Sequence, residues 1–171
     1  ARGALGAIAN MAEDYGTHHL MVNRVNAQHT LCALMRHKNL ACQREAARAE
    51  SNILSTSQFH ENFLQEDGLR SVFAICRTKN IECFYLAAII FHKLSPIVAN
   101  HDTMIGKGVL QPLISLISGQ EKDVATQAAA ALRDLCSNKD HKITIAQEGG
   151  LKCLIALARE KDLPLRILAI G

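Results

Sequence analysis

The chain has little of what marks several common classes of protein. Its 171 residues include no tryptophan, only 3 prolines and 4% aromatic residues. Lysine and arginine total 19 against 16 acidic residues, and a formal charge of +3 is too small to indicate a nucleic-acid-binding protein. The longest unbroken apolar run, residues 83–91, is far shorter than the roughly 20 residues that a membrane span needs. We therefore expect neither a nucleic-acid partner nor a membrane span.

The cysteines form no Cys-x-x-Cys pair and no Cys/His group at zinc-finger spacing. Each lies inside an apolar periodic segment, where a free cysteine behaves as a small hydrophobic residue. Reduced thiols in a core favour a cytosolic or nuclear location over secretion, and we expect an intracellular, cytoplasmic protein. The six residues are Cys32, Cys42, Cys76, Cys83, Cys136 and Cys153.

A repeat with a period of 41 residues runs through the sequence. Segments that begin at positions 67, 108 and 149 carry apolar residues at the same places, such as Leu69, Leu110 and Leu151. Within each segment the apolar positions follow at i, i+3 and i+4, which is the spacing of one face of a helix. Self-similarity at this period predicts a stack of helical units.

Each unit is predicted to contain three helices. The second helix carries the leucine-rich segment, and glycines at positions 68, 108, 149 and 150 suit the corner before it, where a positive φ is tolerated. The third helix is longer and has small residues in register, such as Ala46, Ala87 and Ala128. The short first helices are expected at 18–24, 60–66, 101–106 and 141–147, and the third helices at 40–54, 81–94, 123–136 and from 163 onward.

These motifs resemble the armadillo repeat, in which a Gly-x-Leu-x-x-Leu-Ile segment precedes an alanine-rich helix, as in residues 108–135 here. The resemblance implies an all-α fold, a right-handed alpha solenoid with three helices per repeat of about 41 residues. It divides residues 1–171, taken as one array, into a partial repeat 1–25, repeats 26–66, 67–107 and 108–148, and a partial repeat 149–171. Since neither end has a polar capping face, we expect a fragment that continues into further repeats at both ends.

Histidines recur at the start of the short first helices. They are His18, His19, His60, His101 and His141. Neighbouring repeats are roughly 10 Å apart, so one histidine per repeat cannot share a metal ion, and a capping or turn role is expected instead. The chain also lacks a nucleophile motif and a glycine-rich phosphate loop. We expect no catalytic site, no metal and no cofactor, and hence no enzyme.

Armadillo proteins bind extended partner segments along a concave groove lined by their third helices, and an asparagine near the end of each third helix holds the partner's backbone. The resemblance places Asn10 and Asn52 at that position, but Lys93 and Asp134 depart from it. Importins of the alpha type carry tryptophan one turn earlier, and this chain has none there. A nuclear-signal receptor is therefore disfavoured.

The middle third helix, 81–94, is apolar nearly all round. Leu86 and Ile89 align with groove positions, which suggests an apolar spot between Arg48 and Lys93 that suits an apolar anchor with nearby acidic groups. The other interpretation is that the chain itself covers these side chains. The predicted partner-binding residues are Asn10, Glu45, Arg48, Asn52, Leu86, Ile89, Lys93, Gln127, Ala130 and Asp134.

Two functions are compatible with these sequence features. The first is a non-enzymatic scaffold that binds a protein or an extended peptide segment along the groove. The second is a permanent structural subunit of a large cytoskeletal, axonemal or other multisubunit assembly, which would place the chain at the cytoskeleton or in a cilium. Obligate interfaces are larger and more apolar than transient ones, and the apolar middle helix leans towards the second function.

Overall fold

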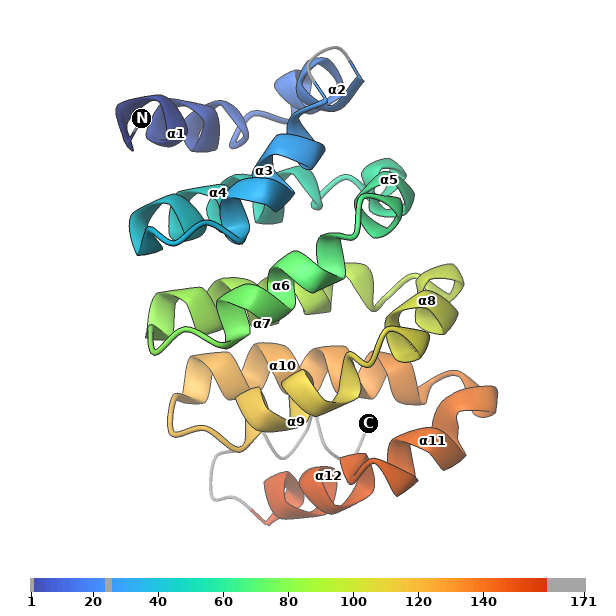
Figure 1. The fold of residues 1–171 in the computed structure, drawn as a ribbon. Helices are drawn as coiled ribbons and strands as arrows, with labels where there is room; N and C mark the ends of the chain where they lie inside the picture. The colour runs from blue at the N-terminus through green and yellow to red at the C-terminus, as the bar shows by residue number, and fades with distance from the viewer. Residues whose placement is uncertain (1, 24–25, 160–171) are drawn as a thin grey trace. The chain divides into compact units, whose positions relative to one another are not determined.

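A computed structural model describes residues 2–23 and 26–159, and across these ranges the chain is helical with no β-strand (Figure 1). The predicted all-α fold class is confirmed. The chain divides into two compact units, residues 1–90 and 91–171, with the boundary inside one helix. The third helix expected from residue 163 onward lies outside the described residues.

The described helices follow the predicted order of short, second and third helix. Unit 1 contains α1 (Arg2–Met11), α2 (Tyr15–Asn23), α3 (Ala27–Met35), α4 (Leu40–Ile53), η1 (Ser57–Phe59), α5 (His60–Gln65), α6 (Gly68–Cys76) and most of α7 (Ile81–Leu94). Unit 2 contains the end of α7, then η2 (Val98–Asn100), α8 (His101–Gly106), α9 (Leu110–Ile117), α10 (Lys122–Cys136), η3 (Lys139–His141), α11 (Lys142–Gln147) and α12 (Gly150–Ala158).

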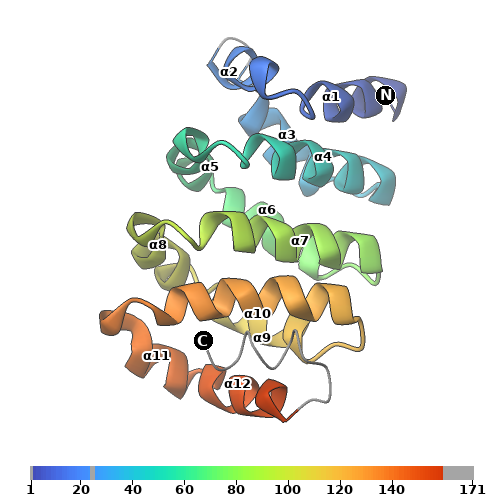
Figure 2. The ribbon, with the colours of Figure 1, turned by 180° about the vertical axis from the view of Figure 1, so that it is seen from behind.

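Alanine lets the helices of unit 1 pack closely. Ala46, Ala47 and Ala49 of α4 are fully buried, and α4 lies against α1, α3 and α6 (Figure 2). In unit 2, α10 packs on α9 with its central alanines, residues 128–131, buried in the same way. Small side chains on these faces bring helix backbones together, while leucine and isoleucine fill the remaining volume.

A buried histidine closes each of three junctions between a third helix and the following short helix. The Nε2 atoms of His18, His60 and His101 lie 2.7, 2.8 and 2.6 Å from the backbone oxygens six residues earlier, those of Ala12, Leu54 and Ser95. Because a carbonyl oxygen only accepts, each ring donates its Nε2–H. The predicted turn role is confirmed for these three histidines.

The other two histidines of the predicted series behave differently. His141 does not follow the same pattern: its Nε2 lies 2.7 Å from Oδ1 of Asp102. His19 is exposed on α2.

The glycines before the second helices serve two different needs. Gly108 and Gly149 have φ of 84° and 96°, so these two confirm the expected positive φ. Gly68 does not, because Asp67 takes the left-handed conformation there with φ of 59°. Gly68 is needed for space instead: a Cβ atom would lie 2.4 Å from the buried Phe63 ring. Gly150 is restricted in the same way by Ile145, whose Cγ2 atom would lie 2.5 Å from an added Cβ.

The histidine contact predicts a stability effect in unit 1. His60→Ala removes the donor to the buried Leu54 carbonyl, so we expect the free energy of unfolding to fall by about 1–3 kcal/mol. Denaturant unfolding followed by circular dichroism measures this change. His19→Ala, on an exposed residue, is the control and is expected to unfold like the parent chain. Equal midpoints for both variants would contradict the structural role of His60.

The glycine corner gives a second prediction. Gly68→Ala forces a methyl group into the Phe63 ring, and overpacking of this kind costs about 1–3 kcal/mol of stability. Gly106→Ala is the matched control, since nothing lies within 4 Å of the added Cβ and the site is helical. We expect the control to be neutral or slightly stabilising, and thermal melts of the two variants should separate. Coincident melts would show that Phe63 moves aside at no cost.

Candidate functional site

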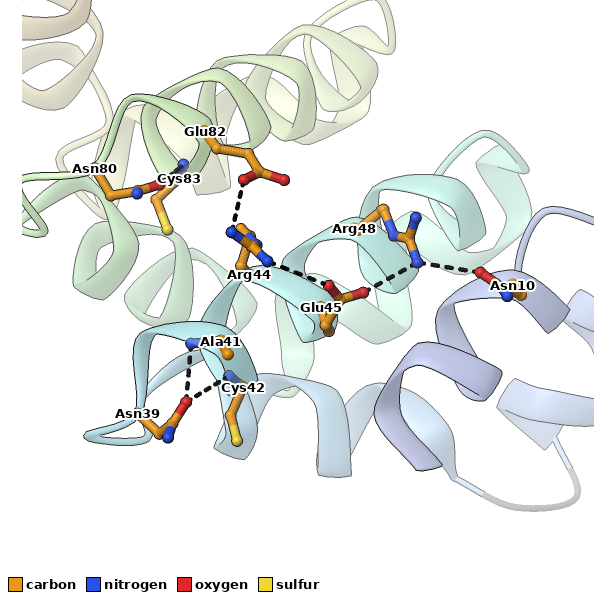
Figure 3. Close-up of polar contacts among 10 residues, drawn as sticks. All are labelled: Asn10, Asn39, Ala41, Cys42, Arg44, Glu45, Arg48, Asn80, Glu82 and Cys83. Carbon is orange, nitrogen blue, oxygen red and sulfur yellow. Dashed lines mark hydrogen bonds and ion pairs between the residues drawn. The ribbon is translucent and has the colours of Figure 1, made fainter. Parts of the chain in front are cut away.

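Asparagine side chains cap the N-termini of two third helices of unit 1, α4 and α7. The Asn39 side-chain oxygen accepts hydrogen bonds from the backbone N–H groups of Ala41 and Cys42, at 2.9 and 3.2 Å, and so caps α4 (Figure 3). At the start of α7, the Asn80 side chain accepts from the N–H of Cys83 at 3.0 Å. Capping satisfies N–H groups that the first turn leaves unpaired. The two caps therefore fix where α4 and α7 begin.

Charged side chains on α4 join three successive third helices into a ladder of contacts. Arg44 Nη1 lies 3.0 Å from Glu82 Oε2 of α7, and Arg44 Nη2 lies 3.8 Å from Glu45 Oε1. The other oxygen of Glu45 lies 3.0 Å from Arg48 Nη2, which donates to Asn10 Oδ1 of α1 at 3.1 Å. Figure 3 shows these side chains directed toward one another from α7, α4 and α1. We call Asn10, Arg44, Glu45, Arg48 and Glu82 the charged ladder.

The charged ladder lies at the surface but is partly covered. The side chains of Arg44 and Arg48 are 29% and 39% exposed, and Glu45 between them is 19% exposed. Two arginines one turn apart repel each other, and the shared carboxylate offsets that repulsion. Each such partly exposed pair contributes only about 0–1 kcal/mol to stability. The ladder therefore orients two guanidinium groups, but the stability of unit 1 does not depend on their ion pairs.

The structure brings three of the predicted unit 1 site residues into this cluster: Asn10, Glu45 and Arg48. Asn52 is half-buried on α4, one turn beyond Arg48. The predicted apolar spot is smaller than expected, because Leu86 is only 7% exposed and belongs to the core. Ile89 is half-buried.

Three of the predicted site residues lie in unit 2 and are either buried or bonded to other residues of that unit. Gln127 Oε1 accepts from the ring nitrogen Nδ1 of His92 at 2.7 Å, and Ala130 is only 4% exposed. Asp134 accepts from Ser95 Oγ at 2.9 Å and from the guanidinium of Arg133 at 2.9 Å. An ionised aspartate also lacks the N–H donor that an asparagine offers at this position.

The remaining predicted residue of unit 2, Lys93, is half-buried near the end of α7. Burial lowers the pKa of its ammonium group.

A cavity of about 770 Å³ lies in unit 2 beside Asp134. Arg133 and Lys142 give it a cationic side, and Ile145, Leu151 and Leu154 line it with apolar side chains. Within the described part of the chain, no three metal-ligating side chains come together, here or elsewhere.

Sequence reasoning did not include Arg44 and Glu82 in the site. A signal was available, since Glu82 follows Arg44 by 38 residues, nearly one period, and so falls on the next third helix.

No single helix among residues 2–23 and 26–159 is long and apolar enough to cross a membrane; only α7 taken with residues 98–106, as a bent pair, has that length and composition.

Residues 99–137 match the family described as the armadillo/beta-catenin-like repeat. No curated protein matches the chain.

Several solved structures have the same fold. A designed armadillo repeat protein in complex with the peptide (KR)4 superposes with a TM-score of 0.89 at 18% identity, over 98% of this chain and 71% of that one. A computationally designed armadillo repeat protein for modular peptide recognition gives 0.91 at 17% identity, with the same coverage. An engineered protein gives 0.90 at 23% identity, over 98% of this chain and 42% of that one. The chain therefore has the fold of the armadillo repeat proteins, and its residues 99–137 match that family's repeat in sequence.

Proposed function

We propose that this chain is a non-enzymatic scaffold that binds an extended partner segment across the third helices α1, α4 and α7 of unit 1. The observation that carries the proposal is the charged ladder, in which side chains from these three helices converge on α4. Two neighbours in fold were designed for peptide recognition or solved with a bound peptide, and they support peptide binding as the use of this fold.

The ladder suggests which partner would bind. In the free protein, each ladder arginine is paired with a glutamate of the chain itself. Glu82 lies 3.0 Å from Arg44, and Glu45 lies 3.0 Å from Arg48. A carboxylate on the partner can replace Glu82, the more exposed of the two at 53%, and pair with Arg44 in a bidentate geometry. Ile89 supplies limited apolar contact. The proposed ligand is an extended segment with an acidic side chain near an apolar one.

An array of extended peptides that vary in charge and hydrophobicity tests this function. We expect peptides with adjacent acidic and apolar residues to bind, and binding to weaken as salt is raised, because exposed charge pairs are screened. A photoreactive residue at position 89 should cross-link to the bound peptide. Cross-links that join only positions of this chain, or copies of it, would count against the proposal.

The arginine on the ladder gives a quantitative prediction. Arg44→Glu should weaken binding of the peptide selected on the array by at least about tenfold, because the charge-assisted hydrogen bond from Arg44 to the partner's carboxylate contributes about 1.5–3 kcal/mol. Fluorescence anisotropy with labelled peptide measures the affinity. Arg70→Glu is the control, since the Arg70 side chain is 76% exposed on α6, outside the ladder, and its guanidinium lies 3.7 Å from the Asp67 carboxylate. Equal losses for the two variants would mean that net charge alone drives binding.

A hydrophobic contact is tested by Ile89→Asp. We expect this substitution to abolish peptide binding while leaving the thermal melt of the chain unchanged, because Ile89 is half-buried rather than in the core. Circular dichroism checks the fold and anisotropy checks binding. If the variant unfolds, Ile89 is a core residue and the ligand must be held by the ladder alone.

Permanent incorporation into a large assembly is the second candidate. Exposed apolar side chains favour it: Leu40, Ile81 and Tyr85 are 42%, 56% and 38% exposed at or near the starts of α4 and α7. Sedimentation of native cell extracts distinguishes the two. A scaffold that exchanges partners should sediment partly as a small species, whereas a structural subunit should remain in a large complex at all dilutions.

A further inference from the structure

An ionisable side chain lies in the core of unit 1. Glu50 of α4 is 0% exposed, at a position that the 41-residue register fills with Phe91 and Leu132 in the next two repeats. Those two residues are also fully buried. A carboxyl group therefore replaces an apolar side chain at an interior position, and this substitution is costly unless polar partners surround it.

Only one of the two carboxyl oxygens of Glu50 has a hydrogen-bond partner among the described residues. Oε1 accepts a hydrogen bond from Gln28 Nε2 of α3 at 2.8 Å. The Gln28 side chain is itself buried and is held in turn by Asn62 of α5, which donates to its Oε1 at 2.6 Å, while its amide also lies 3.3 Å from the Phe59 carbonyl. The second oxygen, Oε2, has no hydrogen-bond partner among the described residues. The amides thus orient the carboxyl group but do not compensate a negative charge.

The surrounding groups add no positive charge next to Glu50. On α3, the Cys32 thiol lies close enough to Glu50 to be affected by its charge, and Arg36 and Glu66 act on the same thiol. From α5, the buried His60 is bonded to the Leu54 carbonyl. The helices α1 and α6 also pack on α4, and their buried residues, among those described, carry no charge. Loss of solvent raises the pKa of Glu50 to about 8, against an ordinary value of 4.5, and the hydrogen bond from Gln28 only partly opposes this.

We propose that Glu50 is a proton-controlled latch: the neutral acid keeps α3, α4 and α5 closed around it, and loss of the proton opens the core of unit 1. The sign follows from linkage. The closed core binds a proton that the opened core releases, so stability is full below about pH 4.5 and falls as the pH rises to about 8. In that window the equilibrium constant for opening should rise about tenfold per pH unit, since one proton is released.

Cys32 reports the opening directly, because its thiol is 1% exposed and belongs to the same core. The full chain and Glu50→Gln are treated with iodoacetamide at several pH values, and modification of Cys32 is followed by peptide mass spectrometry. Iodoacetamide reaches Cys32 only in the opened core, where the solvated thiol ionises alike in both proteins, so the ratio of the two rates isolates the effect of Glu50 on opening. We expect this ratio to rise about tenfold per pH unit between about pH 5 and pH 8 and then to level off.

The same digest provides the control, Cys153 of α12 in unit 2, for which the ratio should stay constant. A constant ratio at Cys32 would overturn the proposal, and a parallel rise at Cys153 would overturn a latch confined to unit 1. If Glu50→Gln fails to fold, Glu50→Leu restores the apolar residue type of the register. That variant should lose the pH dependence of its thermal midpoint above about pH 5, and a midpoint that still falls as in the parent chain would refute the latch.

Discussion

Close approach of third helices through alanine is the constraint on which unit 1 depends. Ala46, Ala47 and Ala49 have no side chain beyond Cβ, so α4 sits against its neighbours at short range. Long side chains on the outer face of α4 can then reach the adjacent helices. Arg44 contacts α7 and Arg48 contacts α1, both at about 3 Å. With larger residues on the inner face these arginines would end in solvent, and the charged ladder would not form.

The period and the helices could be predicted from the sequence because they depend on spacing alone. Repetition at 41 residues located the second and third helices of the described residues to within a few residues, and it identified His18, His60 and His101 as turn residues. Register also assigns each side chain to a face of its helix. Register does not show how far the neighbouring helix is, and for that reason Leu86 was expected at the surface although it is 7% exposed.

Side-chain pairing was the part that could not be predicted. Asp134 and Glu82 are both acidic residues on third helices, yet Asp134 is taken up by Ser95 and Arg133, whereas Glu82 reaches Arg44. The difference depends on rotamers and on the identity of a residue nearly one period away. Gly68 is similar: the sequence shows a glycine at a corner, but only the position of the Phe63 ring explains why it must be glycine.

The separation in sequence of the contacts between neighbouring repeats has a consequence for how the chain folds. His18 to Thr56, Ser71 to Cys32 and Ser95 to Asp134 join residues 38, 39 and 39 positions apart, and each histidine junction spans six. Every one of these links closes within about one repeat length, so no ordered distant segment is needed before a neighbouring pair of repeats can form. Nucleation can therefore start at more than one place along the polypeptide and spread outward, as expected for a nearest-neighbour chain. Duplication of a 41-residue segment would likewise reproduce these links at the new joint, so the array can lengthen without new contacts being invented.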